Sequence, residues 1–175
     1  MTKALSFLYG VVCYAVFLLA FLYAIGFVGN LFVIKSIDSG LESGVVQSLI
    51  VNLVLLGLFA VQHTIMARPA FKQWWTKIVP AQIERSTFVL AASLLLLLLY
   101  WQWRPLPGVI WSVESVIGQT LLLGLFWLGW ATVLWSTFLI DHYDLFGLRQ
   151  VWLHLRGQEY RHAEFQTKGL YRYVR

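Results

Sequence analysis

The chain has 175 residues, of which 59% are hydrophobic and only 12% are charged, and its mean hydropathy is +0.72. Soluble domains carry about 25% charged residues, so this composition excludes an ordinary soluble domain and indicates an integral membrane protein. The formal net charge is +5. No soluble domain with a basic stripe accompanies this charge, which argues against nucleic acid as a partner.

Four long segments lack any Asp, Glu, Lys or Arg. Each holds roughly 18 or more residues, enough for a helix to cross about 30 Å of hydrocarbon. The segments are continuously apolar and do not alternate, which favours helices over a β-barrel. We therefore expect an all-α fold, a multi-span helical bundle with about four transmembrane helices. The expected spans are residues 4–28, 45–66, 86–103 and 117–140.

The first span could instead be a cleaved signal peptide, because Ala24-Ile25-Gly26 resembles a small-residue cleavage site. Its apolar run is longer than the about 7–15 residues of a signal core, which favours a retained span. Cys13, the only cysteine, lies within this span. A single cysteine cannot form an intrachain disulfide, and we interpret it as a small packing residue.

The basic residues are divided unevenly between the two sides of the predicted bundle. Eleven of the 13 lie at the N-terminus, in the loop between the second and third spans, or in the C-terminal tail, whereas the other two are Lys35 and Arg104. The positive-inside rule makes the richer side cytoplasmic. We therefore expect both ends of the chain in the cytoplasm, with the spans in a bacterial inner membrane.

Two short segments on that side are expected to lie at the membrane surface. Pro69 is suited to open a helix that continues through the aromatic residues at 71–78. After the fourth span, apolar residues recur at helical spacing over 145–155, which predicts an amphipathic interfacial helix ending near Gly157. The four spans and an interfacial tail at 141–175 are expected to form one membrane domain over residues 1–175.

Ionisable side chains occur at three helix ends on the predicted cytoplasmic side. His63 lies about one turn inside the end of the second span, Glu84 and Arg85 open the third, and Asp141 and His142 close the fourth. A polar group at membrane depth is costly, so several of them at one level indicate a functional site.

Each of these residues also has a simpler interpretation. His63 could hydrogen-bond a neighbouring helix, while Glu84 could pair with Arg85, or Asp141 with Arg149, at the surface. Asp141-His142 with Asp144 could bind a metal, but this signal is weak. A haem normally needs two facing histidines inside the bundle, and only His63 lies within a span. We therefore predict no metal.

Ordered blocks along the chain resemble the nurim family of membrane proteins. These blocks are Gln62-His63-Thr64, Met66-Ala67-Arg68, Trp74-Trp75, Glu84-Arg85-Ser86, the run from Asp141 to Trp152, and the segment from His162 to Arg175. The pattern is most similar to the bacterial branch that methylates methanethiol to dimethyl sulfide. The resemblance implies S-adenosylmethionine as cofactor and a small thiol as substrate. A non-catalytic nurim-like protein and a haem or quinone protein are the alternatives.

The last residues resemble the start of the Gly-x-Tyr-Arg-x-x-Arg-His-Pro signature of membrane methyltransferases of the isoprenylcysteine carboxyl methyltransferase type. This resemblance implies that Tyr171, Arg172 and Arg175 begin the cofactor-binding segment. The His-Pro of the signature would follow Arg175. We therefore expect the chain to be the N-terminal part of a longer enzyme and expect these 175 residues alone to be inactive.

The implied chemistry suggests roles for the polar residues. A thiolate, and not the thiol, is the nucleophile in methyl transfer to sulfur, so a base or a positive charge beside it should help. We predict His63 as the catalytic base, with Arg68 or Arg85 as the stabilising charge. The further site candidates are Glu84, Asp141 and His142.

Overall fold

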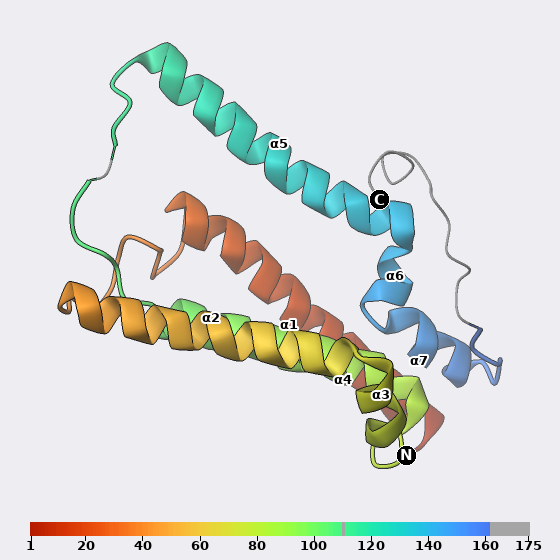
Figure 1. Cartoon of the computed structure of the whole chain (residues 1–175). Helices are drawn as coiled ribbons and strands as arrows, with labels where there is room; N and C mark the ends of the chain where they lie inside the picture. The colour runs from red at the N-terminus through yellow and green to blue at the C-terminus, as the bar shows by residue number, and fades with distance from the viewer. Residues whose placement is uncertain (110, 162–175) are drawn as a thin grey trace.

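The computed structural model describes residues 1–109 and 111–161, and all regular secondary structure in these ranges is helical (Figure 1). Four of the described helices are long and apolar enough to cross a membrane: α1 (Lys3–Gly29), α2 (Val45–Ala67), α4 (Ala81–Gln102) and α5 (Val116–Ile140). The short helices are α3 (Pro69–Trp75), α6 (His142–Leu145) and α7 (Leu148–Leu155). The expected all-α, four-span class is confirmed, and the chain is an integral membrane protein.

Local signals explain where the long helices begin and end. α1 starts after Thr2, whose hydroxyl oxygen accepts a hydrogen bond from the Leu5 amide at 3.3 Å. It ends at Asn30, which adopts the left-handed conformation common at helix C-termini. α4 starts at Ala81, directly after Pro80 and five residues before the expected span. The difference arises because the apolar run predicts the membrane-crossing part, whereas the helix itself continues through a polar first turn.

α1 lies against both α4 and α7, and most of its buried residues are small. Cys13 is fully buried and is a free thiol, as its interpretation as a packing residue requires. Small residues allow membrane helices to approach closely, which increases van der Waals contact where no hydrophobic force drives association. The small buried residues of these two long helices are Ser6, Gly10, Cys13, Ala20 and Gly26 on α1 and Ser86 and Ser93 on α4.

A larger apolar cluster holds α1, α2 and α4 together near the C-terminal end of α1. It consists of Phe27, Leu55, Leu99 and Tyr100. The loop between α1 and α2 is fixed to this end, since the indole N–H of Trp103 donates to the Ile37 carbonyl at 3.0 Å. This packing fixes the relative positions of the three helices along their length.

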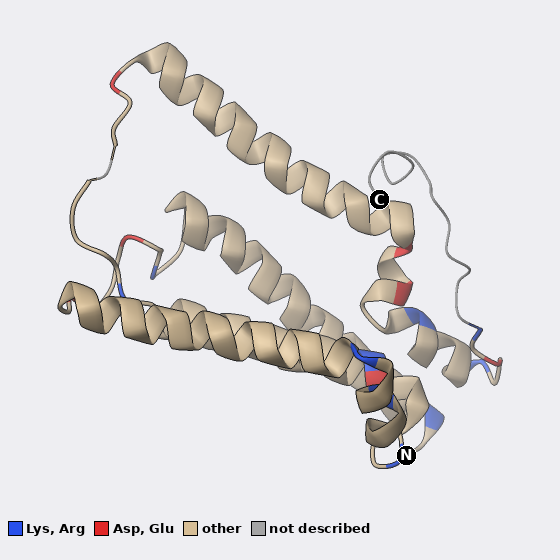
Figure 2. Cartoon of the chain, viewed as in Figure 1, with Lys and Arg blue, Asp and Glu red and all other residues tan. Residues whose placement is uncertain are grey.

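We call the end of the molecule that carries Lys3, α3, α6 and α7 the basic end. Figure 2 shows that Lys and Arg residues are concentrated there, while the opposite end carries Lys35 and Arg104. The structure therefore keeps the charge asymmetry seen in the sequence. Which end faces the cytoplasm remains a prediction.

α5 stands apart from α1, α2 and α4 (Figure 1). None of its residues is buried. Trp130 of α5 contacts Phe21 of α1 edge-on, with ring centroids 5.5 Å apart. The C-terminal end of α5 is joined to the rest of the molecule by α6. The apolar side chains on its exposed surface are suited to lipid.

The two short surface helices differ in detail from their expected form. α3 ends at Trp75, before the expected limit of 78. α7 lies within the expected range, but Val151 is its fully buried residue, because this side chain packs directly over Gly10. Trp152, which belongs to the expected apolar stripe, is 44% exposed.

Candidate functional site

His63 and Arg85 lie against the same aromatic ring at the basic end. The ring centroids of His63 and Phe88 are 5.1 Å apart, and the guanidinium carbon of Arg85 is 5.0 Å from the Phe88 centroid. His63 also stacks on Phe59 at 5.5 Å. The imidazole is exposed, and its nitrogens make no hydrogen bond with the part of the chain that the structure describes. Both ring nitrogens are therefore available to a hydrogen-bonding partner.

Arg85 is held in place by the turn between α6 and α7. Its Nε donates to the Leu145 carbonyl at 2.7 Å, and the neighbouring Ser86 hydroxyl donates to the Gly147 carbonyl at 3.3 Å. Gly147 has φ 85°, and a Cβ added there would lie 2.7 Å from the Ser86 backbone nitrogen. Only glycine allows this close approach. The position of Arg85 thus depends on a tight contact between α4 and the turn.

Glu84 occupies the first turn of α4 and is half-buried. Its Oε1 is shielded from solvent and lacks a hydrogen-bond partner among residues 1–109 and 111–161, as does Oε1 of Gln62 on α2. Adjacent helix residues do not face one another, which explains why no ion pair joins Glu84 to Arg85 in those ranges. An unsatisfied buried acceptor costs about 1–3 kcal/mol and calls for an explanation such as an external donor.

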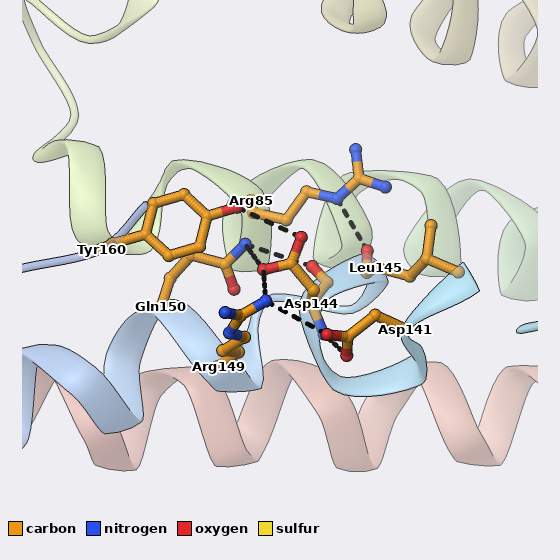
Figure 3. Close-up of polar contacts among 7 residues, drawn as sticks. All are labelled: Arg85, Asp141, Asp144, Leu145, Arg149, Gln150 and Tyr160. Atoms are coloured by element: carbon orange, nitrogen blue, oxygen red, sulfur yellow. Dashed lines mark hydrogen bonds and ion pairs between the residues drawn. The ribbon is translucent and has the colours of Figure 1, made fainter. Parts of the chain in front are cut away.

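Asp141 and Asp144 belong to a separate polar cluster with Arg149 (Figure 3). Nη1 of Arg149 lies 3.1 Å from Asp141 Oδ2 and 3.7 Å from Asp144 Oδ1. Asp144 also accepts hydrogen bonds from Gln150 Nε2 at 3.4 Å and from the Tyr160 hydroxyl at 3.1 Å. The ion pair between Asp141 and Arg149, the simpler interpretation of Asp141, is therefore present.

Tyr160 strengthens this cluster. Burial, together with the hydrogen bond to Asp144 and the charge of Asp144, raises the pKa of Tyr160 to about 12. The hydroxyl therefore keeps its proton and continues to donate to Asp144 at neutral pH. Because both carboxylate oxygens of Asp144 have partners, the cluster stabilises the link between α6 and the segment after α7.

His142 is buried, with 5% of its surface exposed. Its Nε2 lies 2.8 Å from the Tyr14 hydroxyl and its Nδ1 2.8 Å from the Thr137 hydroxyl, and its ring stacks on Phe138 with centroids 4.3 Å apart. Burial lowers the pKa of His142, while nearby Asp141 acts in the opposite direction. With both nitrogens occupied, His142 connects α1, α5 and α6 and has no nitrogen free for a haem or metal.

The structure thus brings two of the candidate residues, His63 of α2 and Arg85 of α4, to the ring of Phe88. Glu84 precedes Arg85 in the first turn of α4. Asp141 and His142 lie near this group, but their polar atoms bond to other residues. Arg68 is exposed at the junction of α2 and α3. The cofactor-binding candidates Tyr171, Arg172 and Arg175 lie outside the described residues.

Two further observations concern the rest of the described residues. No group of three or more His, Cys, Asp or Glu in them is placed to hold a metal ion. An apolar hollow at the start of α2 lies at the end opposite to His63, and the residues that line it are Gly44, Val45, Val46, Gln47, Ile50 and Val51.

Sequence reasoning missed the hydroxyl partners of His142 and the contribution of Tyr160. The partners of His142 could have been suspected from the sequence, because Tyr14 and Thr137 are polar residues inside apolar spans, where polar groups need partners within the protein. No comparable signal marks Tyr160, whose contact depends on how the chain turns after α7.

Comparison with known proteins gives matches along the whole chain. A methanethiol S-methyltransferase of Mycobacterium tuberculosis is 57% identical over all 175 residues, which cover 72% of that relative. One from Crocosphaera subtropica is 49% identical over the same 175 residues and 69% of its own length. Mouse nurim is 31% identical over 122 residues, 66% of this chain and 46% of nurim. No protein-family model and no solved structure matches.

The described residues define a multi-span membrane protein that has, at one end of its helices, an imidazole without a hydrogen bond and a carboxylate and a guanidinium without an ion pair. The chain belongs to the methanethiol S-methyltransferase family, with nurim as a more distant relative.

Proposed function

We propose that this protein methylates the sulfur of methanethiol to form dimethyl sulfide, with S-adenosylmethionine as methyl donor. Two methanethiol S-methyltransferases are 57% and 49% identical to this chain over all 175 residues, which supports the reaction. The structural observation that carries it is the free imidazole of His63, which shares the Phe88 ring with Arg85. An apolar thiol can reach this position through the bilayer, whereas a charged donor arrives from water, so both can meet at helix ends near the membrane boundary.

His63 takes the proton of the thiol in this proposal, because the thiolate is the effective nucleophile. The new bond forms between the thiol sulfur and the methyl carbon, while the bond from that carbon to the donor sulfur breaks and its electron pair stays with the donor. Arg68 or Arg85 supplies positive charge to the thiolate. The rings of Phe59 and Phe88 pack against the imidazole and make its surroundings more apolar, which strengthens these electrostatic effects.

The residues at the basic end fit the proposed cofactor. S-adenosylmethionine supplies an electrophilic methyl group when bound, and carries an ammonium, a carboxylate and hydroxyl groups. Unsatisfied acceptors on Gln62 and Glu84 and the guanidinium of Arg85 are complementary to such a ligand. By resemblance, Tyr171, Arg172 and Arg175 begin the cofactor-binding segment.

The orientation that suits this chemistry places the basic end in the cytoplasm. In the topology expected from the sequence, 11 of the 13 basic residues fall on the side of this end, which supports the orientation through the positive-inside rule. In this arrangement both ends of the chain face the cytoplasm of a bacterium, and the cofactor site opens to the compartment that contains the cofactor.

The assignment is tested with the protein expressed from its complete gene in a bacterium that makes no dimethyl sulfide. Cells supplied with methanethiol should release dimethyl sulfide into the headspace, measured by gas chromatography, and cells with the empty vector should not. Purified protein should give the same product with S-adenosylmethionine. If no methylated product forms with methanethiol or with several larger thiols, the assignment is wrong and the non-catalytic alternative is favoured.

A further inference from the structure

Two adjacent residues of opposite charge open α4, and neither forms an ion pair with the residues that the structure describes, although the charge of Glu84 acts on Arg85. Glu84 and Arg85 make no ion pair with each other, and the ion pairs in those ranges join Arg149 to Asp141 and Asp144. A charge that is partly buried without a partner is costly. A ligand that carries both charges would relieve this cost at both residues.

The guanidinium of Arg85 is oriented before any ligand arrives. The Leu145 carbonyl takes its Nε proton, and the ring of Phe88 lies 5.0 Å from its central carbon. Figure 3 shows the two terminal nitrogens pointing away from Asp144 and Asp141, whose oxygens are occupied by other donors. The free edge of Arg85 can thus donate two parallel hydrogen bonds, the geometry that suits a carboxylate.

The carboxylate of Glu84 restricts which ligand this position accepts. Its buried Oε1 needs a donor, and the donor with the best electrostatic match is a cation. A polyanion such as phosphate would bind Arg85 but would be repelled by Glu84. A thiolate would be repelled in the same way. A small zwitterion, with an ammonium beside a carboxylate, satisfies both residues.

We infer that Glu84 and Arg85 bind the α-amino-acid end of the cofactor, with Glu84 accepting from its ammonium group and Arg85 donating to its carboxylate. This inference rests on the proposed function and deepens it. It also separates the two arginines by role, since it assigns Arg85 to the cofactor and leaves Arg68 as the positive charge for the thiolate.

Binding of three nucleosides to the protein from its complete gene tests this assignment. S-adenosylhomocysteine carries the whole amino-acid end, decarboxylated S-adenosylmethionine lacks only the carboxylate, and 5′-methylthioadenosine lacks the entire end. Titration calorimetry in nanodiscs without phosphatidylethanolamine avoids competition from a headgroup with the same two charges. Wild type should bind S-adenosylhomocysteine about ten- to a hundred-fold more tightly than 5′-methylthioadenosine, the range expected for charge-assisted hydrogen bonds.

The variants should separate the two charges. Glu84→Gln should weaken S-adenosylhomocysteine and decarboxylated S-adenosylmethionine about tenfold each, because both carry the ammonium. Arg85→Gln should weaken S-adenosylhomocysteine alone. Unchanged affinity for 5′-methylthioadenosine shows that each variant is folded, and Arg85→Lys replaces Arg85→Gln if that affinity is lost. The charge-matched controls Glu42→Gln and Arg161→Gln, at exposed positions, should change none of these affinities.

The outcomes distinguish this inference from the proposed function. If wild type binds S-adenosylhomocysteine more tightly than 5′-methylthioadenosine and the variants keep this preference, Glu84 and Arg85 do not have the inferred role. The cofactor assignment then stays intact. Variants that weaken all three ligands in the same ratio would overturn the inferred role too. If wild type binds none of the three ligands, both the inference and S-adenosylmethionine as cofactor are wrong.

Discussion

The hydroxyl of Tyr14 and Nε2 of His142 lie 2.8 Å apart, and this contact joins α1 to α6 at the basic end. The other ring nitrogen of His142 contacts Thr137 near the end of α5. Because α5 has no buried residue along its length, a hydrogen-bonded imidazole at its C-terminal end is important for its position. His142 is therefore a structural residue in the described chain.

The lowered pKa of His142 predicts that acid destabilises the protein. As the pH falls below about 6.5, the ordinary pKa of histidine, the unfolded chain takes up a proton at His142 before the folded chain does. The free energy of unfolding should therefore decrease as the pH falls through this window. Thermal unfolding in detergent between pH 7.5 and 5.5 measures the effect.

Two histidine variants show whether that pH dependence comes from His142. His142→Gln should unfold at a lower temperature than wild type at pH 7.5 but lose less stability on acidification. His154→Gln, on the surface helix α7, should retain the wild-type pH dependence. An equal loss of stability on acidification in wild type and His142→Gln would contradict the prediction.

The close contact of Gly147 with Ser86 predicts a large effect from a single methyl group. Gly147→Ala places a Cβ 2.6 Å from the Ser86 hydroxyl oxygen and 2.7 Å from its amide nitrogen, at a backbone φ of 85° that alanine rarely adopts. We expect a loss of about 1–3 kcal/mol in unfolding free energy from the steric overlap. Gly124→Ala, with nothing within 4 Å, is the matched control and should be neutral or slightly stabilising. If Gly147→Ala and wild type have equal unfolding free energies in a denaturant series, the turn accommodates the added methyl group and the prediction is wrong.

The number and position of the membrane helices could be predicted because the hydrocarbon thickness fixes the length of an uncharged run. α1, α2 and α5 begin and end within one residue of the expected spans. α4 differs because its helix begins before the apolar run begins. Its polar first turn, which includes Glu84 and Arg85, continues the helix beyond the predicted span.

The rotation of each helix could not be read from one sequence, and it decides which candidate residues are free. His63 and His142 both lie near the end of a predicted span, yet His63 has an exposed ring without a hydrogen bond in the described residues and His142 is buried between two hydroxyls. The same holds for the acidic residues, because Asp141 is paired and Glu84 is not. The contact of His142 with Tyr14 joins helices that are distant in sequence, so spacing along the chain carries no information on it, whereas the pair of Asp141 with Arg149 is local and could be anticipated.

The charge asymmetry between the two ends predicts the membrane orientation. Reporter fusions placed after Lys35 and after Lys77 should report opposite sides, with the Lys77 fusion in the cytoplasm, because the basic residues remain on the side where the chain is made. A phosphatase that is active only outside the cytoplasm and a fluorescent protein that folds only inside it provide complementary readouts. Both fusions on one side would overturn the orientation and the proposed access of the cofactor.

The free imidazole of His63 predicts a specific kinetic defect. His63→Ala in the protein from its complete gene should lower kcat for methanethiol by about 10²–10⁴-fold, the usual contribution of a general base. The affinity for S-adenosylhomocysteine should change little, because the base acts on the thiol. The defect should shrink as the pH rises, since more thiol then ionises without help, whereas a merely structural defect would not follow the pH. His154→Ala serves as the control. A His63→Ala rate equal to wild type at neutral pH would remove His63 from the mechanism and leave Arg68 as the group that favours the thiolate.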